Sequence, residues 1–176
     1  GKEAARAGHW AAAAECYQKA AEQGSSAGLS LLGECLYQGR GVPKSAAQAR
    51  KLWKAAAESG EPIALLSLGD HCAARGDNGK ALLWYRRARQ NAAAVPDIEY
   101  TPRVCLRLAQ YETRYTSRKK ALAQAAEAKQ AFTILLREHE PDADRWLQEA
   151  EQLLYALTHE PPTAPAAYNI ESLQLD

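Results

Sequence analysis

The N-terminal part of the chain contains the same segment twice, thirty-six residues apart. Residues 17–24 read YQKAAEQG and precede a Leu-Gly pair at 32–33, whereas residues 53–60 read WKAAAESG and precede a Leu-Gly pair at 68–69. A repeat of this period, with apolar residues at helical spacing inside each copy, is typical of solenoids built from paired helices. One pair cannot bury its apolar face alone, so neighbouring pairs stack and share a core.

Composition points to the same fold class. Ala dominates a hydrophobic fraction of 47%, and the chain has one Phe and no Met. Ala is the best helix former and lets helices approach closely, whereas the β-branched residues that favour sheets are scarce. A length of 176 residues is enough for one short repeat array with a real core. The prediction is an all-α solenoid of antiparallel helix pairs.

Turn and capping residues predict where the helices begin and end. Gly24 ends the first helix, and Ser25 offers an N-cap for the second. Residues 39–43 break the chain before a new start near Ser45, and Gly60 stops the helix that follows. Helices are expected over residues 2–22, 26–38, 102–113, 117–138 and 142–158, with a long connection at 92–101.

These helices group into one repeat domain over residues 1–159. Its four units span residues 2–44, 45–75, 76–115 and 116–159, the last being a diverged C-terminal cap. From Glu160 the character changes, because the prolines at 161, 162 and 165 cannot continue a helix. Residues 160–176 are therefore interpreted as a Pro-rich linker and an acidic, apolar tail.

The repeated residues resemble Sel1-like repeats, a branch of the tetratricopeptide-repeat superfamily. The resemblance rests on an Ala-Ala-Glu-x-Gly segment, a small residue four positions later, a Leu-Gly pair and a Gly-x-Gly-Val turn. In the first copy these are Ala20-Ala21-Glu22-x-Gly24, Gly28, Leu32-Gly33 and Gly39-x-Gly41-Val42. The resemblance is strong over residues 10–69. It continues over residues 70–115, where the third copy looks like an ordinary tetratricopeptide repeat.

This resemblance implies a right-handed superhelix whose first helices line a concave groove for proteins or peptides. It carries over no catalytic motif and no cofactor. Some cysteine-rich members staple each repeat with a disulfide, but the matching positions here are Ala21 with Gly28 and Ala57 with Ala64.

The residues that could carry chemistry form no catalytic or metal-binding pattern. The cysteines lie on or beside apolar helical stripes, and none belongs to a Cys-x-x-Cys pair. They are therefore expected to act as small buried hydrophobic residues. These cysteines are Cys16, Cys35, Cys72 and Cys105. The adjacent His71 and Cys72 would point about 100° apart on a helix, so they cannot easily share a metal ion. Neither a nucleophile elbow nor a phosphate loop is present. We predict no enzyme, no metal and no cofactor, and free thiols favour the cytoplasm or another reducing compartment.

Overall charge excludes some partners. A formal net charge of +1 gives no reason to expect nucleic acid, and no apolar run is long enough to span a membrane. The sequence shows no N-terminal signal segment, but it begins with Gly1, which leaves open whether a signal or a flanking domain precedes it.

Cations beside the first-helix stripes are the main functional signal. If those helices line the groove, the cations would favour an acidic peptide or a C-terminal carboxylate; they are Lys19, Arg50, Lys51, Lys54, Arg86 and Arg87. The alternative is an ordinary solvated helix face. The aromatic residues on the stripes are expected to be core: Tyr17, Trp53, Trp84 and Tyr85. Trp10 could be a partner anchor or part of the first cap.

The tail suggests a second interaction. Apolar residues mixed with acids resemble a short linear ligand that docks into the basic groove of its own chain or of a neighbour, giving autoinhibition or self-association; they are Tyr168, Ile170, Leu173 and Leu175. The alternative is a terminus without a docking role.

Three functions fit these patterns. The first is a non-catalytic adaptor or scaffold that binds a partner polypeptide, such as an acidic peptide, in the groove. The second is an assembly or secretion chaperone for an apolar client, and the third is a regulatory arm of a larger protein. Salt separates the first two, because binding of an acidic peptide weakens as ionic strength rises.

Overall fold

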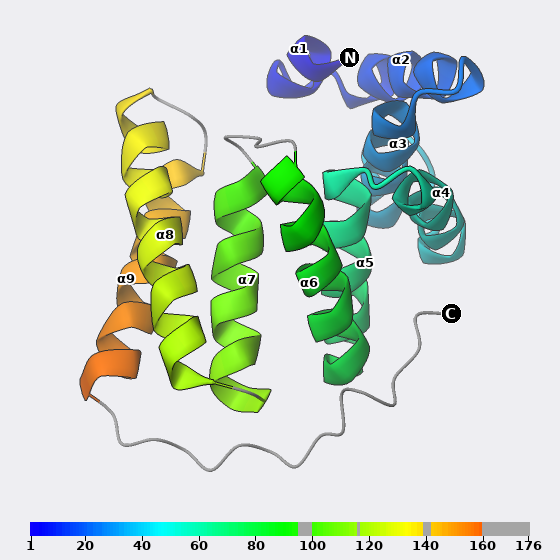
Figure 1. The fold of residues 1–176 in the computed structure, drawn as a ribbon. Coiled ribbons are helices and arrows are strands. Elements are labelled where there is room, and N and C mark those ends of the chain that lie inside the picture. Colours follow the sequence, from blue (N-terminus) through cyan, green and yellow to red (C-terminus); the bar gives the residue numbers. More distant parts are fainter. Residues whose placement is uncertain (95–99, 116, 139–141, 160–176) are drawn as a thin grey trace. The chain divides into compact units, whose positions relative to one another are not determined.

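The computed structural model describes residues 1–94, 100–115, 117–138 and 142–159, and its regular elements there are all α-helices (Figure 1). The all-α prediction is therefore confirmed. The helices are α1 (Lys2–Arg6), α2 (Trp10–Glu22), α3 (Ser26–Gln38), α4 (Ala46–Glu58), α5 (Pro62–Ala74), α6 (Asn78–Ala94), α7 (Tyr100–Tyr115), α8 (Arg118–Arg137) and α9 (Ala143–His159). The chain divides into two compact units, Gly1–His71 and Cys72–Asp176.

In the first unit, serine caps set the starts of the helices. The Ser25 hydroxyl accepts a hydrogen bond of 3.1 Å from the Gly28 N–H, and the Ser45 hydroxyl accepts one of 3.4 Å from the Gln48 N–H. Each cap satisfies a backbone donor that the first turn of a helix leaves unpaired. Gly39, with φ of +76°, ends α3 in the left-handed conformation that glycine adopts readily.

The prediction of one helix over residues 2–22 is wrong. The structure has two helices, α1 and α2, separated by a turn at Gly8 with φ of +78°. A residue in the left-handed region cannot belong to a right-handed helix. No residue of α1 is fully buried, but Ala4 and Ala5 pack against the core cluster that contains Ala13 and Tyr17.

The core of the first unit is built around Trp53 on α4. This side chain is 1% exposed, and its indole N–H donates a hydrogen bond of 3.2 Å to the carbonyl of Ser30 on α3. The rings of Tyr37 and His71 lie beside it, with centroids 5.3 and 6.4 Å away. The indole therefore joins α3, α4 and α5, which pack around a single aromatic centre.

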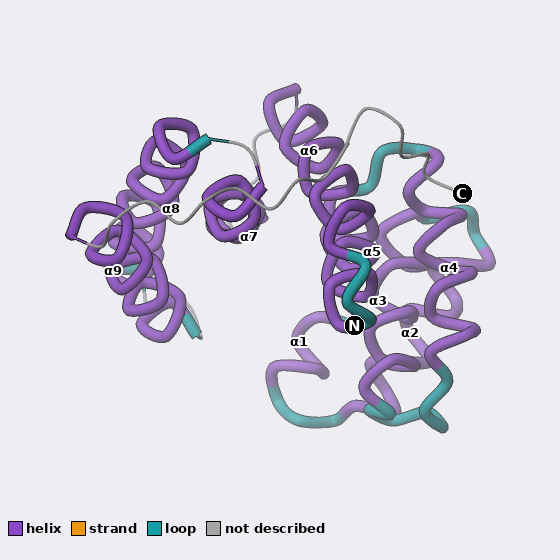
Figure 2. The backbone as a smooth tube through the Cα atoms, turned by 90° about the horizontal axis from the view of Figure 1, so that it is seen from below, coloured by secondary structure: helices purple, strands orange, loops and turns teal. Residues whose placement is uncertain are grey.

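In the second unit, α7, α8 and α9 lie side by side in two perpendicular views (Figures 1 and 2). Small residues line their contacts, among them Ala121, Ala125 and Ala128 on α8, all fully buried. Phe132 of α8 packs on Trp146 of α9 with ring centroids 5.6 Å apart. Alanine lets these helices approach closely, and the two rings fill the space that remains.

The predicted connection at residues 92–101 is too long. Helix α6 continues to Ala94 and α7 already begins at Tyr100, while residues 95–99 lie outside the described part. The three alanines at 92–94 are strong helix formers, which explains the extension of α6.

Candidate functional site

The aromatic stripe belongs to the core, as predicted. Tyr17 is 7% exposed, Trp84 6% and Tyr85 0%, so none of these rings offers a binding surface. Trp10 is half-buried, and the Arg40 guanidinium lies 4.5 Å from its ring centroid. Trp10 is thus partly covered by a residue of its own chain, a contact that the sequence pattern did not reveal.

The cysteines divide into three kinds of environment. Cys35 and Cys105 are buried and Cys72 is half-buried, whereas Cys16 is exposed. Burial is the main reason why the pKa of the Cys35 thiol is raised and why that of Cys105 rises to about 12. A thiol with a raised pKa is a poor nucleophile at neutral pH.

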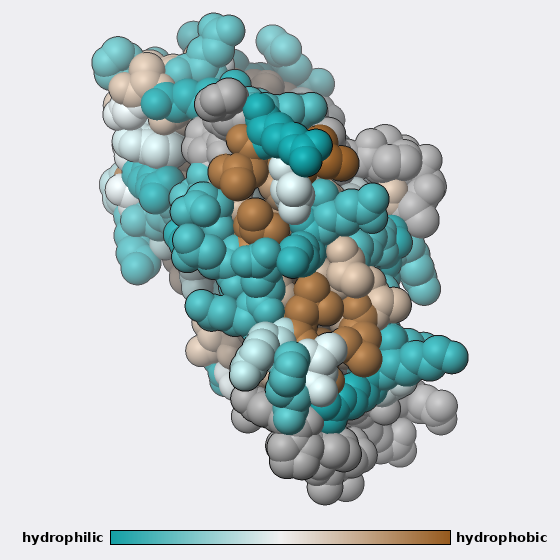
Figure 3. All heavy atoms as spheres, turned by 90° about the vertical axis from the view of Figure 1, so that its left-hand side faces the viewer, coloured by the Kyte–Doolittle hydropathy of each residue, from teal (hydrophilic) through white to brown (hydrophobic). Residues whose placement is uncertain are grey.

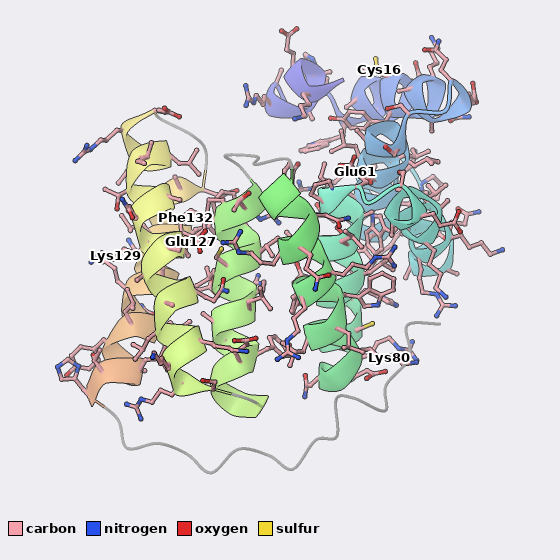
Figure 4. The ribbon with its side chains drawn as sticks, in the orientation of Figure 1. Cys16, Glu61, Lys80, Glu127, Lys129 and Phe132 are labelled. Carbon is pink, nitrogen blue, oxygen red and sulfur yellow. The ribbon has the colours of Figure 1, made fainter. Side chains whose placement is uncertain are left out.

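The prediction of a buried thiol is wrong for Cys16, which lies on the outer side of α2 (Figure 4). The buried residues of α2 are Ala13, Ala14 and Tyr17, so its core face is narrower than the apolar spacing suggested. Among the residues that the structure describes, no three His, Cys, Asp or Glu side chains form a metal-binding group.

The predicted cations of the first unit are exposed or half-buried, and they have no ion-pair partner among the described residues. Arg50 and Lys51 of α4 are exposed and Lys54 is half-buried, and Lys19 of α2 is exposed. None of the four makes an ion pair within the described ranges. Residues 50, 51 and 54 lie within about 100° of one another around α4. We call Arg50, Lys51 and Lys54 the α4 cationic face.

The predicted cations of the second unit are engaged within the chain. Arg86 pairs with Glu112 on α7 at 3.2 Å, and the Glu112 side chain is only 7% exposed. The Arg87 guanidinium lies 5.7 Å from the ring centroid of Trp84. Spacing along one helix could not reveal the Arg86 contact, because its partner lies 26 residues away on another helix. Within the described part of the chain, the predicted cations of α4 thus have no ion-pair partner, whereas those of α6 contact residues of their own chain.

The tail residues predicted to dock, namely Tyr168, Ile170, Leu173 and Leu175, lie outside the described residues. The concave groove that the resemblance implies stays a prediction, as does the division into four repeat units.

Stacked helices with alanine-rich contacts, a few aromatic centres and a charged outer surface define the class of helical-repeat proteins, or α-solenoids. Residues 11–25 and 26–61 match the Sel1 repeat, and residues 45–96 match a tetratricopeptide repeat. Residues 11–96 therefore consist of Sel1-like and tetratricopeptide repeats, as the sequence resemblance predicted.

Two solved structures share this fold. A Sel1 repeat protein from Oxalobacter formigenes has a TM-score of 0.53 and 22% identity, over 81% of this chain and 64% of that one. A protective antigen present in uropathogenic Escherichia coli strains, described as having an SLR fold, has a TM-score of 0.56 and 23% identity, over 84% of this chain and 34% of that one. This chain thus spans less than two thirds of either protein. No curated protein matches it.

Repeats of these two kinds are typical of non-catalytic scaffolds that mediate protein–protein interaction. In the described part of the chain, no helix has both the length and the apolar character needed to cross a membrane.

Proposed function

We propose that this protein is a non-catalytic adaptor that binds an acidic segment of a partner polypeptide on the α4 cationic face. The observation that carries the proposal is the contrast between the two units. Arg50, Lys51 and Lys54 have no charged partner in the described chain, whereas Arg86 of α6 is paired. A partner that supplies carboxylates at matching positions would form ion pairs with these three cations.

The spacing of these cations sets the geometry of the partner. Arg50 and Lys54 are one helical turn apart, a rise of about 6 Å, and Lys51 lies beside them on the same side of α4. A helix with acids three or four residues apart, or an extended segment with acids at alternate positions, matches this spacing.

Charge also sets the strength and the salt dependence of the interaction. Exposed ion pairs contribute about 0.2–1 kcal/mol each, so three pairs give modest affinity and mainly steer the encounter. The Debye length falls from about 10 Å at 0.1 M salt to about 3 Å at 1 M. An acidic partner should therefore be released at high salt, whereas an apolar client of an assembly or secretion chaperone should be retained.

The experiment compares the wild type with Arg50→Glu/Lys51→Glu/Lys54→Glu. Its matched control is Arg75→Glu/Lys119→Glu/Lys120→Glu, which makes the same change of charge at exposed positions that do not belong to α4. Fluorescence anisotropy measures binding of a labelled peptide with Glu at every third or fourth position, and the same peptide with Gln serves as the second control.

We expect the α4 variant to bind the Glu peptide at least about tenfold more weakly than the control variant does. The Gln peptide should bind neither of the two variants. Circular dichroism checks that both variants keep their helices. Equal binding by the α4 variant and the wild type would refute the α4 site. Binding that persists at 1 M salt would favour the chaperone over the adaptor.

A further inference from the structure

Helices α8 and α9 present a patterned surface on one side of the pair. On this side of the second unit, hydrophobic residues gather in two groups with hydrophilic residues between them (Figure 3). The sequence places Leu122, Lys129 and Leu136 seven residues apart along α8, which keeps them on one stripe with a drift of only about 20° per step. The pattern along α8 is therefore apolar, charged, apolar.

Helix α9 repeats this pattern. Leu147, Glu151 and Leu154 follow one another at helical spacing, and both leucines are half-buried. Glu151 pairs with Lys129 at 3.0 Å, so the two charged positions meet between the helices. Lys129 points away from α7 (Figure 4).

Each apolar group is anchored in the core and continues to the surface. Leu122 and Leu154 both pack on the buried cluster that contains Ala125, so they form one group. Leu147 packs on the cluster around Phe132 and belongs to the other group. Leu136 lies at the same end of the α8–α9 helix pair as Leu147, and it is 40% exposed. We call this surface, with its two apolar groups and the central Lys129–Glu151 pair, the α8–α9 face.

The central ion pair shows what could cover this face. The Lys129 and Glu151 side chains remain 45% and 49% exposed, so each can accept a second charged partner. A covering surface with two apolar groups and one cation beside one anion would match. The α8–α9 face itself has this pattern.

We propose that the α8–α9 face binds a second copy of this chain. A two-fold axis between the copies, parallel to α8, places each apolar group against the same group of the other copy. It also places Lys129 against Glu151 of the second copy, and Glu151 against its Lys129. Such an interface is isologous, the commonest arrangement in homodimers. This inference does not depend on an acidic partner at α4.

The size of the face limits the affinity. Helix α8 has 20 residues and is about 30 Å long. Two helices side by side are about 20 Å wide, which gives about 600 Å² on each copy, or about 1,200 Å² in total. That total lies at the lower end for specific interfaces. We therefore expect a reversible dimer with a dissociation constant on the order of micromolar.

The first experiment exchanges charges between copies. Lys129→Glu leaves two acids at the centre of the face, and Glu151→Lys leaves two bases. In sedimentation equilibrium we expect the wild type to dimerise and each variant alone to dimerise at least about tenfold more weakly, because like charges would meet. An equimolar mixture of the two variants should restore the dimer, because acids then face bases.

A second comparison tests the apolar groups. Leu136→Glu should weaken the dimer, whereas Ile134→Glu should not, although Ile134 is equally exposed at 43% and lies on the same helix. Residue 134 is about 160° from residue 136 around α8, so it lies off the face. Circular dichroism identifies any variant that fails to fold, and the mixed-variant result does not require the Leu136 variant.

Three results would overturn the proposal. One is a wild type that stays monomeric at concentrations of hundreds of micromolar. Another is two folded charge variants that do not associate when mixed. The third is a monomeric wild type that dimerises only after residues 160–176 are deleted, because the tail would then be the natural cover of this face.

Discussion

Gly33 lies directly against the indole of Trp53, and a Cβ atom at residue 33 would come within 2.5 Å of the indole nitrogen. The ring has nowhere to move, because Trp53 is 1% exposed and its N–H is bonded to the Ser30 carbonyl at 3.2 Å. The glycine of the Leu-Gly pair thus makes room for the aromatic side chain of the following repeat.

Replacing Gly33 with alanine should destabilise the protein. Overpacking costs about 1–3 kcal/mol, and the better helix propensity of alanine, about 1 kcal/mol, only partly offsets it. The measurement is the free energy of unfolding in urea. In a Trp53→Leu background the same substitution should cost clearly less, because the indole is gone. Equal costs in both backgrounds would show that the two residues are not coupled.

Two arginines of α6 should differ in their contribution to stability. Arg86 pairs with a carboxylate that is 7% exposed, whereas the partner of Arg89, Glu127, is 45% exposed. Arg86→Ala should cost about 1–3 kcal/mol, because it weakens the hydrogen bonding of a buried charge. Arg89→Ala should cost less than about 1 kcal/mol. Chemical unfolding of both variants provides the comparison, and similar losses would contradict it.

Local sequence signals predicted the repeated part of the fold well. The range 26–38 matches α3 residue for residue, and Ser45 caps α4 as expected, because each boundary depends on a residue at the boundary itself. The turn at Gly8 was missed because the alanine-rich segment around it continues the helical spacing. Glycine is tolerated in helices, so its presence alone does not reveal a positive φ.

The candidate site was only partly predictable. The sequence could place Arg50 and Lys54 beside an apolar stripe, because that depends on spacing along one helix. It could not show that Arg86 reaches Glu112, or that Lys129 reaches Glu151, because those contacts depend on how different helices pack. Charge placement can be predicted from the sequence, whereas charge compensation requires the structure.

The thiols should differ in reactivity. Cys16 is exposed and should react with a disulfide reagent such as DTNB as soon as it is added to the folded protein. Cys35 and Cys105 are buried with raised pKa values, so they should react only when the structure opens. The test is to count the protein thiols that react with DTNB before and after denaturation. The variant Cys16→Ser should lose the fast phase alone.

Stability should fall at alkaline pH through Cys105. The pKa of its thiol is raised from 9.0 to about 12, mainly by burial and to a smaller extent by the nearby Glu127. Above pH 9 the unfolded chain loses this proton and the folded chain keeps it, so the stabilisation is complete below pH 9 and is lost between pH 9 and 12. The slope contributed is at most about 1.4 kcal/mol per pH unit.

The measurement is the unfolding free energy of the wild type and of Cys105→Ala at several pH values from 7 to 10. The wild type should lose stability faster than the variant above pH 9, whereas Cys16→Ala should follow the wild type throughout. A constant difference between the wild type and Cys105→Ala would show that the buried thiol does not titrate as expected.

The alanine contacts have a consequence for how such a protein changes over time. Its helices meet through side chains such as Ala13, Ala49 and Ala128, all fully buried, while long polar side chains lie on the outward sides. A substitution on the outside therefore leaves these alanine contacts between neighbouring helices untouched. Selection can alter the recognition chemistry of this chain one exposed position at a time while the helical framework persists.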